Sequence, residues 1–288
     1  SIKKTLMNRY QRIDLLFFTY LIGTSLLLIA SYNQTETAFS LFLTRVAIFI
    51  GVVILIKLSS QYTSKIFQLI RAVYPIILSG YFYSETVHYN KLFFNNLDPI
   101  LIDLDFQIFG YQPSVLFSEC FSNPVFSEIM YFGYFSFYLL IIGFVLFAYT
   151  KCKTEFKTLI FKLTASLFLY YSIFGIFPSA GPQFYFSSPD STLPTAYIFD
   201  SVMHFIQANA EQPTCWDFHY YIDADKKRMP LFFKIALPFV CILILSTVYI
   251  KAHYVVDVIG GVISAPIILY LSTKLYHYKN TPKLKEHI

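Results

Sequence analysis

The pair of residues most suggestive of chemistry is a histidine followed four positions later by an aspartate. His253 and Asp257 lie in the stretch STVYIKAHYVVDVIGG, residues 246–261. On a helix, residues four apart share one face, so the carboxylate can bind one imidazole nitrogen and leave the other as a nucleophile or base. The same spacing also fits a histidine held at a membrane interface for structural reasons. The pair alone leaves both interpretations open.

The composition places these residues in a membrane protein. Of the 288 residues, 56% are hydrophobic, 20% are aromatic and only 14% are charged, whereas soluble domains carry about 25% charged residues. The net charge of +5 does not indicate a nucleic-acid partner, because the lysines and arginines fall mainly in short segments between apolar blocks. The four cysteines form no CxxC pair, and there is no dinucleotide, Walker or HExxH motif. We therefore expect no metal, no cofactor and no nucleic acid, with membrane lipids as partners.

Apolar segments of about 17 to 25 residues can cross a bilayer as helices. We predict an all-α, polytopic membrane bundle of about six to seven transmembrane helices. The first apolar segment follows a basic stretch and shows no small-residue cleavage site, so we expect a retained span and no cleaved signal peptide. Residues 1–65 would form an N-terminal transmembrane hairpin and residues 66–288 the main membrane domain. The predicted segments are 13–31, 41–59, 66–85, 126–149, 158–178, 231–250 and 253–275.

The distribution of lysine and arginine predicts the topology. It places the N-terminus in the cytoplasm of a multi-pass protein of the cytoplasmic (inner) membrane, and it agrees with the first five spans. The cluster beginning at Lys226 and the C-terminal tail should both be cytoplasmic, which requires a crossing between residues 179 and 226. No segment there is apolar enough, since 215–229 is short and holds three aspartates. From sequence, one of the two basic clusters is expected to break the rule.

Four segments together resemble a known enzyme superfamily. STVYIKAHYVVDVIGG resembles the third signature of the type-2 phosphatidic acid phosphatases, and IFGYQPSVLFS, EIMYFGYFSFY and FPSAGPQFYF resemble their inositol phosphorylceramide synthase branch. The resemblance spans about residues 66 to 275. It implies that His253 attacks phosphorus to form a phosphohistidine, that Asp257 orients it, and that the active site is extracytoplasmic.

By this resemblance the chain would transfer a phosphoinositol headgroup from a phospholipid donor to a ceramide-like lipid alcohol. A phosphatidate or polyprenyl-diphosphate phosphatase is the alternative among enzymes. Thr247 replaces the arginine that the phosphatases carry six residues before the nucleophile, which favours the transferase. A non-catalytic scaffold or a transporter is the alternative of another class.

The family's second signature, Ser-x-His, is missing. Its histidine would protonate the leaving alkoxide, and it would open a helix in the same stretch where the crossing is missing. We therefore expect segment 215–229 to be altered, through a local frameshift, genuine divergence or a cloning artefact. Loss of a general acid lowers rates by about 10²–10⁴, so we expect severely reduced activity.

Four further residues are candidates for binding substrate. Arg71 is a cation within a span and could bind phosphate, although it could also snorkel or pair with Glu85 or Glu128. Gln183 and Tyr185 could hydrogen-bond a headgroup or anchor the interface. Lys251 could neutralise phosphate or mark the interface.

A further histidine and three aspartates could also take part in chemistry. His219 could replace the missing acid only if it came within hydrogen-bond reach of the leaving group. The aspartates of the stretch after the third span alternate with leucine and isoleucine, which predicts an amphipathic outer segment in preference to a metal site. They are Asp98, Asp103 and Asp105.

Overall fold

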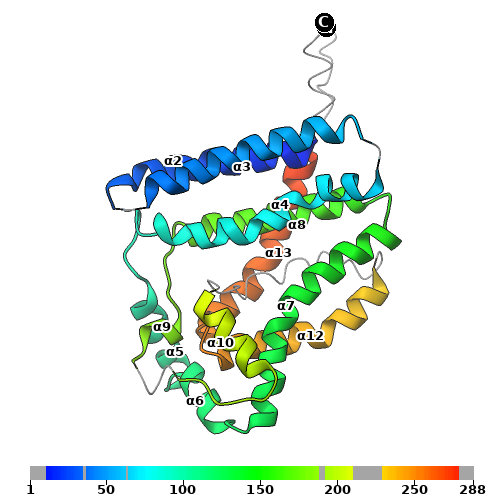
Figure 1. The fold of residues 1–288 in the computed structure, drawn as a ribbon. Helices are drawn as coiled ribbons and strands as arrows, with labels where there is room; N and C mark the ends of the chain where they lie inside the picture. Colours follow the sequence, from blue (N-terminus) through cyan, green and yellow to red (C-terminus); the bar gives the residue numbers. More distant parts are fainter. Residues whose placement is uncertain (1–10, 35–36, 63, 188–191, 210–228, 279–288) are drawn as a thin grey trace, which may run out of the picture.

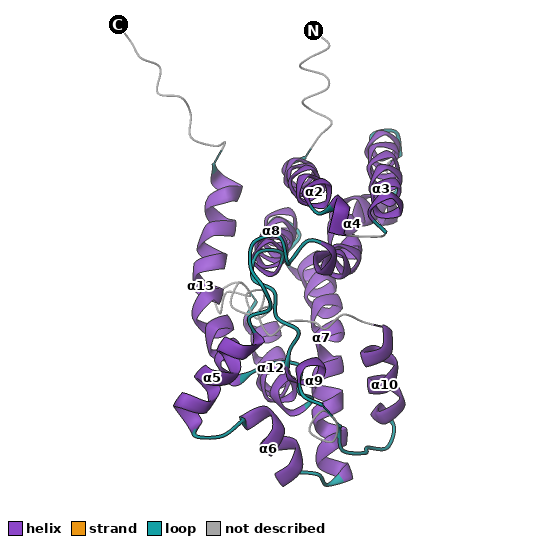
Figure 2. Ribbon diagram, turned by 90° about the vertical axis from the view of Figure 1, so that its left-hand side faces the viewer, coloured by secondary structure: helices purple, strands orange, loops and turns teal. Residues whose placement is uncertain are grey.

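The protein is an all-α bundle. A computed structural model describes residues 11–34, 37–62, 64–187, 192–209 and 229–278, and within these ranges there are helices and no strand (Figures 1 and 2). Six of these helices are long and apolar enough to cross a membrane. They are α2 (Arg12–Ala30), α3 (Ala38–Ser59), α4 (Lys65–Glu85), α7 (Pro124–Lys151), α12 (Pro230–Tyr249) and α13 (Val255–His277). The predicted fold class is confirmed, and the six helices indicate a multi-pass membrane protein.

The remaining predicted span, 158–178, is found as α8 (Phe156–Phe174), which lies at the centre of the bundle. Twelve of its 19 residues are buried, against four of the 22 residues of α3 at the periphery. Lys157 and Lys162 lower the hydropathy of α8, which is not among the helices apolar enough to cross a membrane. A helix surrounded by other helices needs less apolar surface than one that faces lipid, and its position explains the difference.

Helices α7 and α12 form a closely packed antiparallel pair. Tyr249, at the end of α12, lies 2.8 Å from the hydroxyl of Ser127 near the start of α7. At the other end, the ring of Phe232 packs on that of Phe144. Gly133 permits the close approach between them, because a Cβ there would clash with Ile242.

Helices α8 and α13 are also antiparallel. The Thr158 hydroxyl donates to the Tyr276 hydroxyl at 3.0 Å, while Tyr170 lies 3.4 Å from Ser264. The last turn of α13 therefore lies beside the first turn of α8, and Arg12 at the start of α2 joins them by donating to the Tyr276 carbonyl. We call this side of the bundle the basic end.

The opposite side, which we call the site end, carries the short helices. Helices α5 (Asp98–Phe109), α6 (Pro113–Cys120) and α9 (Pro182–Tyr185) gather at the lower left of Figure 1. The first residues of α7 and α13 lie there too, as the contacts of Ser127 and Asp105 show.

The chain crosses from the site end to the basic end between α8 and α12. Tyr131 near the start of α7 donates to the carbonyl of Pro194, so residue 194 is at the site end. Phe232, just inside α12, packs on Phe147 near the end of α7, so α12 begins at the basic end. The expectation that no crossing exists here is wrong.

Part of this crossing is the helix α10 (Phe199–Asn209), which packs alongside α7 (Figure 2). Residues 210–228, which include most of the segment 215–229 expected to be altered, lie outside the described residues. Since α12 begins and α13 ends at the same end, the positive charges need not break the topology rule.

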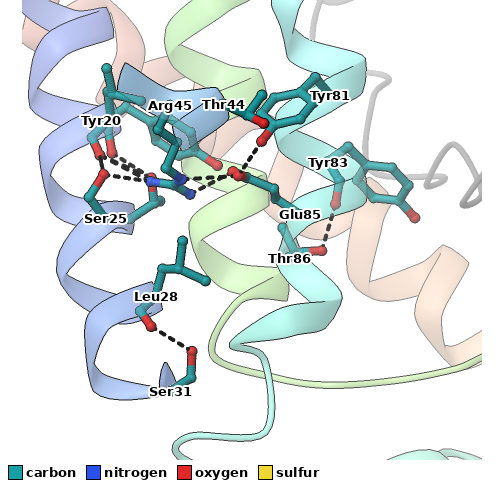
Figure 3. Close-up of polar contacts among 12 residues, drawn as sticks. Tyr20, Ser25, Leu28, Ser31, Thr44, Arg45, Tyr81, Tyr83, Glu85 and Thr86 are labelled. Atoms are coloured by element: carbon teal, nitrogen blue, oxygen red, sulfur yellow. Dashed lines mark hydrogen bonds and ion pairs between the residues drawn. The ribbon is translucent and has the colours of Figure 1, made fainter. Parts of the chain in front are cut away.

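A buried ion pair fastens the N-terminal hairpin to α4 (Figure 3). The Arg45 guanidinium contacts Glu85 through two hydrogen bonds of 3.0 and 2.6 Å, and both side chains are nearly inaccessible. Arg45 also donates to Thr24 and Ser25 of α2, and Tyr81 donates to Glu85. Glu85 is thus paired with Arg45 and not with Arg71, as one alternative had it.

Replacing one member of the Arg45–Glu85 pair should lower the stability of the protein more than replacing both. We expect Glu85→Leu to lower the free energy of unfolding by about 3–5 kcal/mol, because Arg45 is left buried without its partner. The double variant Arg45→Met with Glu85→Leu should be more stable than the single one. Chemical unfolding in detergent measures both, and a double variant less stable than Glu85→Leu would contradict the argument.

The two ends can be told apart by native cysteines. Cys120 is exposed on α6 at the site end, and Cys152 follows Lys151 at the basic end. With the N-terminus in the cytoplasm, a membrane-impermeant thiol reagent applied to intact cells should label a variant that keeps only Cys120. A variant that keeps only Cys152 should react after permeabilisation. Labelling of both from outside would contradict the arrangement of the helices.

Candidate active site

His253 lies in a tight connection between α12 and α13. The amides of Ala252 and His253 both donate to the carbonyl of Thr247, at 2.9 and 3.1 Å. Lys251 has a φ of 60°, a left-handed conformation that is rare outside glycine and that lets the chain reverse here. The connection therefore holds His253 between the two helices, where the residue is buried with 8% of its surface exposed.

The pair His253 and Asp257 is close, but the two residues are not on one helix. Helix α13 begins at Val255, so His253 precedes it and folds back towards Asp257 in the first turn. Imidazole Nδ1 lies 3.6 Å from the nearer Asp257 oxygen, which is an electrostatic contact longer than a hydrogen bond. The expectation of a shared helical face is wrong, whereas the proximity that it predicted is present. With Nδ1 towards the carboxylate, Nε2 is the nitrogen directed away from it.

A buried carboxylate from α5 fixes the start of α13. The two oxygens of Asp105 accept hydrogen bonds from the amides of Val255 and Val256, at 3.1 and 2.9 Å. These amides have no partner within the helix, and a negative charge is favourable at this end of the helix dipole. Burial raises the pKa of Asp105 and the charge of Asp257 adds to this, while the two backbone hydrogen bonds oppose it.

Residues 178–181 form a turn that we call the PSAG turn, after its sequence. A second buried carboxylate joins this turn to the connection between α12 and α13. Asp98 accepts hydrogen bonds from the amides of Ala180 and Gly181, at 2.7 and 2.9 Å, and from the hydroxyl of Tyr254 at 2.8 Å. Burial raises the pKa of the Tyr254 phenol and the neighbouring Asp98 raises it further, so the phenol stays a neutral donor. Asp98 thus links two segments that are more than 70 residues apart in the chain.

The PSAG turn packs directly on the residues before His253. Gly181 has a φ of 82°, and a Cβ there would clash with the carbonyl oxygen of Ala252. Two residues later, the backbone amide of Gln183 donates to the backbone carbonyl of Lys251 at 2.9 Å. Only glycine satisfies both the backbone conformation and this close approach.

Lys251 reaches into the segment that leads to α10. Its ammonium donates to the carbonyl of Thr192 at 2.8 Å, and the side chain is almost fully buried. The same segment is held by Glu128, whose carboxylate accepts from the amides of Tyr197, Ile198 and Phe199. Glu128 is therefore not the partner of Arg71 either.

The structure brings together five of the six sequence-predicted site residues. His253, Asp257, Lys251, Gln183 and the partly exposed Tyr185 all lie at the site end.

Arg71 is not among them, because it is paired with Asp14, which also accepts from Tyr74. Its neighbour Ala72 lines a cavity with Tyr276, which places Arg71 at the basic end, about 30 Å along α13 from His253.

Sequence reasoning missed the roles of Asp98 and Asp105. The amphipathic segment expected around them is present as α5, with Asp103 exposed, but Asp98 and Asp105 are fully buried. Their spacing of seven residues, two helical turns, was the available signal for a shared inward face. In the described ranges, no group of three or more histidine, cysteine, aspartate or glutamate side chains is placed to hold a metal.

The structure describes three histidines besides His253, and one of them, His88, ends the short 3-10 turn that follows α4. His219 lies outside the described residues. His204 is on α10, exposed and 3.6 Å from Asp200, and His277 ends α13 at the basic end.

Comparison with known proteins adds no relative: no family model matches the chain, and no significant match was found among curated proteins or solved structures.

Two glycines with positive φ test the packing of the PSAG turn: Gly110 has φ 78° and ψ 0°, whereas Gly181 has φ 82° and ψ 160°. Gly110 has a φ of 78° with open space around it, so Gly110→Ala should cost only the backbone strain of about 1–2 kcal/mol. Gly181→Ala should cost about 1–3 kcal/mol more, because its φ and ψ lie in a region essentially confined to glycine and because the added Cβ meets the Ala252 carbonyl. Thermal or chemical unfolding of both variants in detergent measures the difference. Equal losses would show that the turn does not press on this connection.

Proposed function

We propose that the chain is an integral membrane lipid phosphotransferase that moves a phosphoinositol-type headgroup to a ceramide-like lipid through a phosphohistidine. The observation that carries this proposal is the packing of the PSAG turn against residues 251 and 252. Two motif segments far apart in sequence thereby meet beside the His253 and Asp257 pair. Their position at one edge of an apolar bundle suits a substrate that stays in the bilayer.

The chemistry follows from the arrangement of the pair. Nε2 of His253 attacks the phosphorus of the donor, the bond to the glycerol oxygen breaks, and that oxygen takes up a proton as the diacylglycerol leaves. The hydroxyl of the acceptor lipid then attacks the phosphohistidine, loses its proton and releases the imidazole. The Asp257 carboxylate beside Nδ1 stabilises the positive charge that the ring carries in between.

Protonation of the glycerol oxygen is the weak step of this scheme. The family's second histidine has no counterpart in the sequence, so we expect slow turnover with natural lipids. A donor with a 4-nitrophenolate leaving group avoids this requirement, because that anion leaves without being protonated. Such a donor separates the role of His253 from that of the missing acid.

Water in place of the lipid alcohol would make the same site a phosphatase. A non-catalytic scaffold is the candidate from another class, and one observation favours it. Lys251, Asp98 and Asp105 all make hydrogen bonds that hold the fold, so the histidine-containing connection has a complete structural role.

The experiment compares His253→Ala with the matched control His204→Ala in purified protein. His204 also lies four residues from an aspartate, Asp200, but it is exposed on α10. With a 4-nitrophenyl phosphoinositol donor, the unaltered protein and His204→Ala should release nitrophenolate. His253→Ala should fall to background, and Asp257→Asn should lose at least about 10²-fold.

Transfer of labelled inositol phosphate to ceramide, compared with its release into water, distinguishes transferase from phosphatase. Nitrophenolate release that is equal in His253→Ala, or absent from the unaltered protein, would contradict catalysis and favour the scaffold.

A further inference from the structure

A cavity of about 210 Å³ lies at the basic end, on the far side of the bundle from His253. It is formed where the starts of α2 and α8 meet α4 and the last turn of α13. Its polar wall includes Arg12 and Lys157, and its apolar wall includes Ile13, Ile160, Phe161 and Tyr276. Nothing in the proposed reaction uses this cavity.

The lining carries two positive charges and no acidic side chain. Arg12 is held in place, since its guanidinium donates to the Tyr276 carbonyl and lies 4.8 Å from the centre of the Tyr276 ring. Lys157 is exposed on the first turn of α8. Asp14, which follows the lining residue Ile13, is paired with Arg71, and Glu155 precedes α8 two residues before Lys157 without lining the cavity. The cavity is therefore electropositive and suits an anion.

A buried guanidinium belongs to the residue next to one that lines the cavity. Arg71 is 1% exposed, and its Nη1 makes no hydrogen bond with any residue that the structure describes. Arg71 precedes the lining residue Ala72 in α4. Arg71 does not itself line the cavity, so its positive charge would act on an anion there at longer range than the charges of Arg12 and Lys157.

The size and walls of the cavity define the kind of anion. Pockets for drug-sized ligands measure about 300–1,000 Å³, so this one accommodates a phosphate group and little more. Two of its wall residues, Ile13 and Tyr276, belong to α2 and α13, which are long and apolar enough to cross a membrane, so acyl chains can follow these helices into the bilayer. Basic pockets between transmembrane helices on the cytoplasmic side are suited to anionic headgroups, which are enriched in that leaflet.

We propose that this cavity binds the phosphate headgroup of an anionic membrane lipid. The site is independent of the proposed reaction and lies at the opposite end of α13. Each of Arg12 and Lys157 contributes one charge to it.

The test measures binding of dioctanoyl phosphatidylglycerol to the full chain in neutral detergent, by the shift of its thermal transition. We expect a saturable shift that zwitterionic dioctanoyl phosphatidylcholine and inorganic phosphate do not reproduce. Lys157→Gln should weaken binding about fivefold, and the double variant with Arg12→Gln about 25-fold. Lys153→Gln removes a charge at the same end without touching the cavity and should leave binding unchanged.

Two further variants keep the result interpretable. Arg12→Lys retains the positive charge, so its affinity for the lipid should stay within about fivefold of that of the unaltered protein. This variant tests the role of the charge even if Arg12→Gln does not fold. His253→Ala should bind the lipid normally, which separates this site from the proposed active site.

An equal shift with phosphate alone, or unchanged affinity in Lys157→Gln, would overturn the proposal. So would loss of binding in His253→Ala.

Discussion

The buried carboxylate of Asp98 is the contact on which the site end depends. It satisfies two amides of the PSAG turn and the Tyr254 hydroxyl at once. At the edge of a bilayer, irregular backbone can be buried only if its polar groups find partners within the protein. Asp105 does the same for the first amides of α13. One short amphipathic helix, α5, thus makes it possible to bury a turn and a helix start beside His253.

Buried charged residues within the spans likewise hold the N-terminal hairpin, α2 and α3, against α4. Arg45 with Glu85 and Arg71 with Asp14 are both buried pairs that join the N-terminal hairpin to α4. A buried pair is costly to break because the remaining charge has no solvent, so each pair fixes the position of a helix. The rule that an intramembrane cation is functional by default therefore has a clear exception here in Arg45, and Arg71 acts first as a structural partner of Asp14.

The helices were predictable because apolar length alone determines them, and the seven predicted segments coincide with helices to within a few residues. The proximity of His253 to Asp257 was also predictable, since four residues of chain can hardly separate them. The partners of Arg71, Asp98 and Asp105 were not, because they come from segments tens of residues away. The crossing before α12 was missed for a related reason: its existence follows from where α12 begins relative to α7, and not from local hydropathy.

The charges around His253 discriminate between the possible substrates. Asp257 lies 3.6 Å from the imidazole, Asp105 binds the amide two residues later, and Asp98 binds the adjacent Tyr254. Lys251 is the cation placed among them, and it already binds the Thr192 carbonyl. A phosphate monoester brings two negative charges towards these carboxylates, whereas a phosphodiester brings one. The repulsion is smaller for the diester, while the hydroxyls of an inositol ring can donate to carboxylates. For the proposed function, this balance favours a phosphodiester over a phosphate monoester as the substrate.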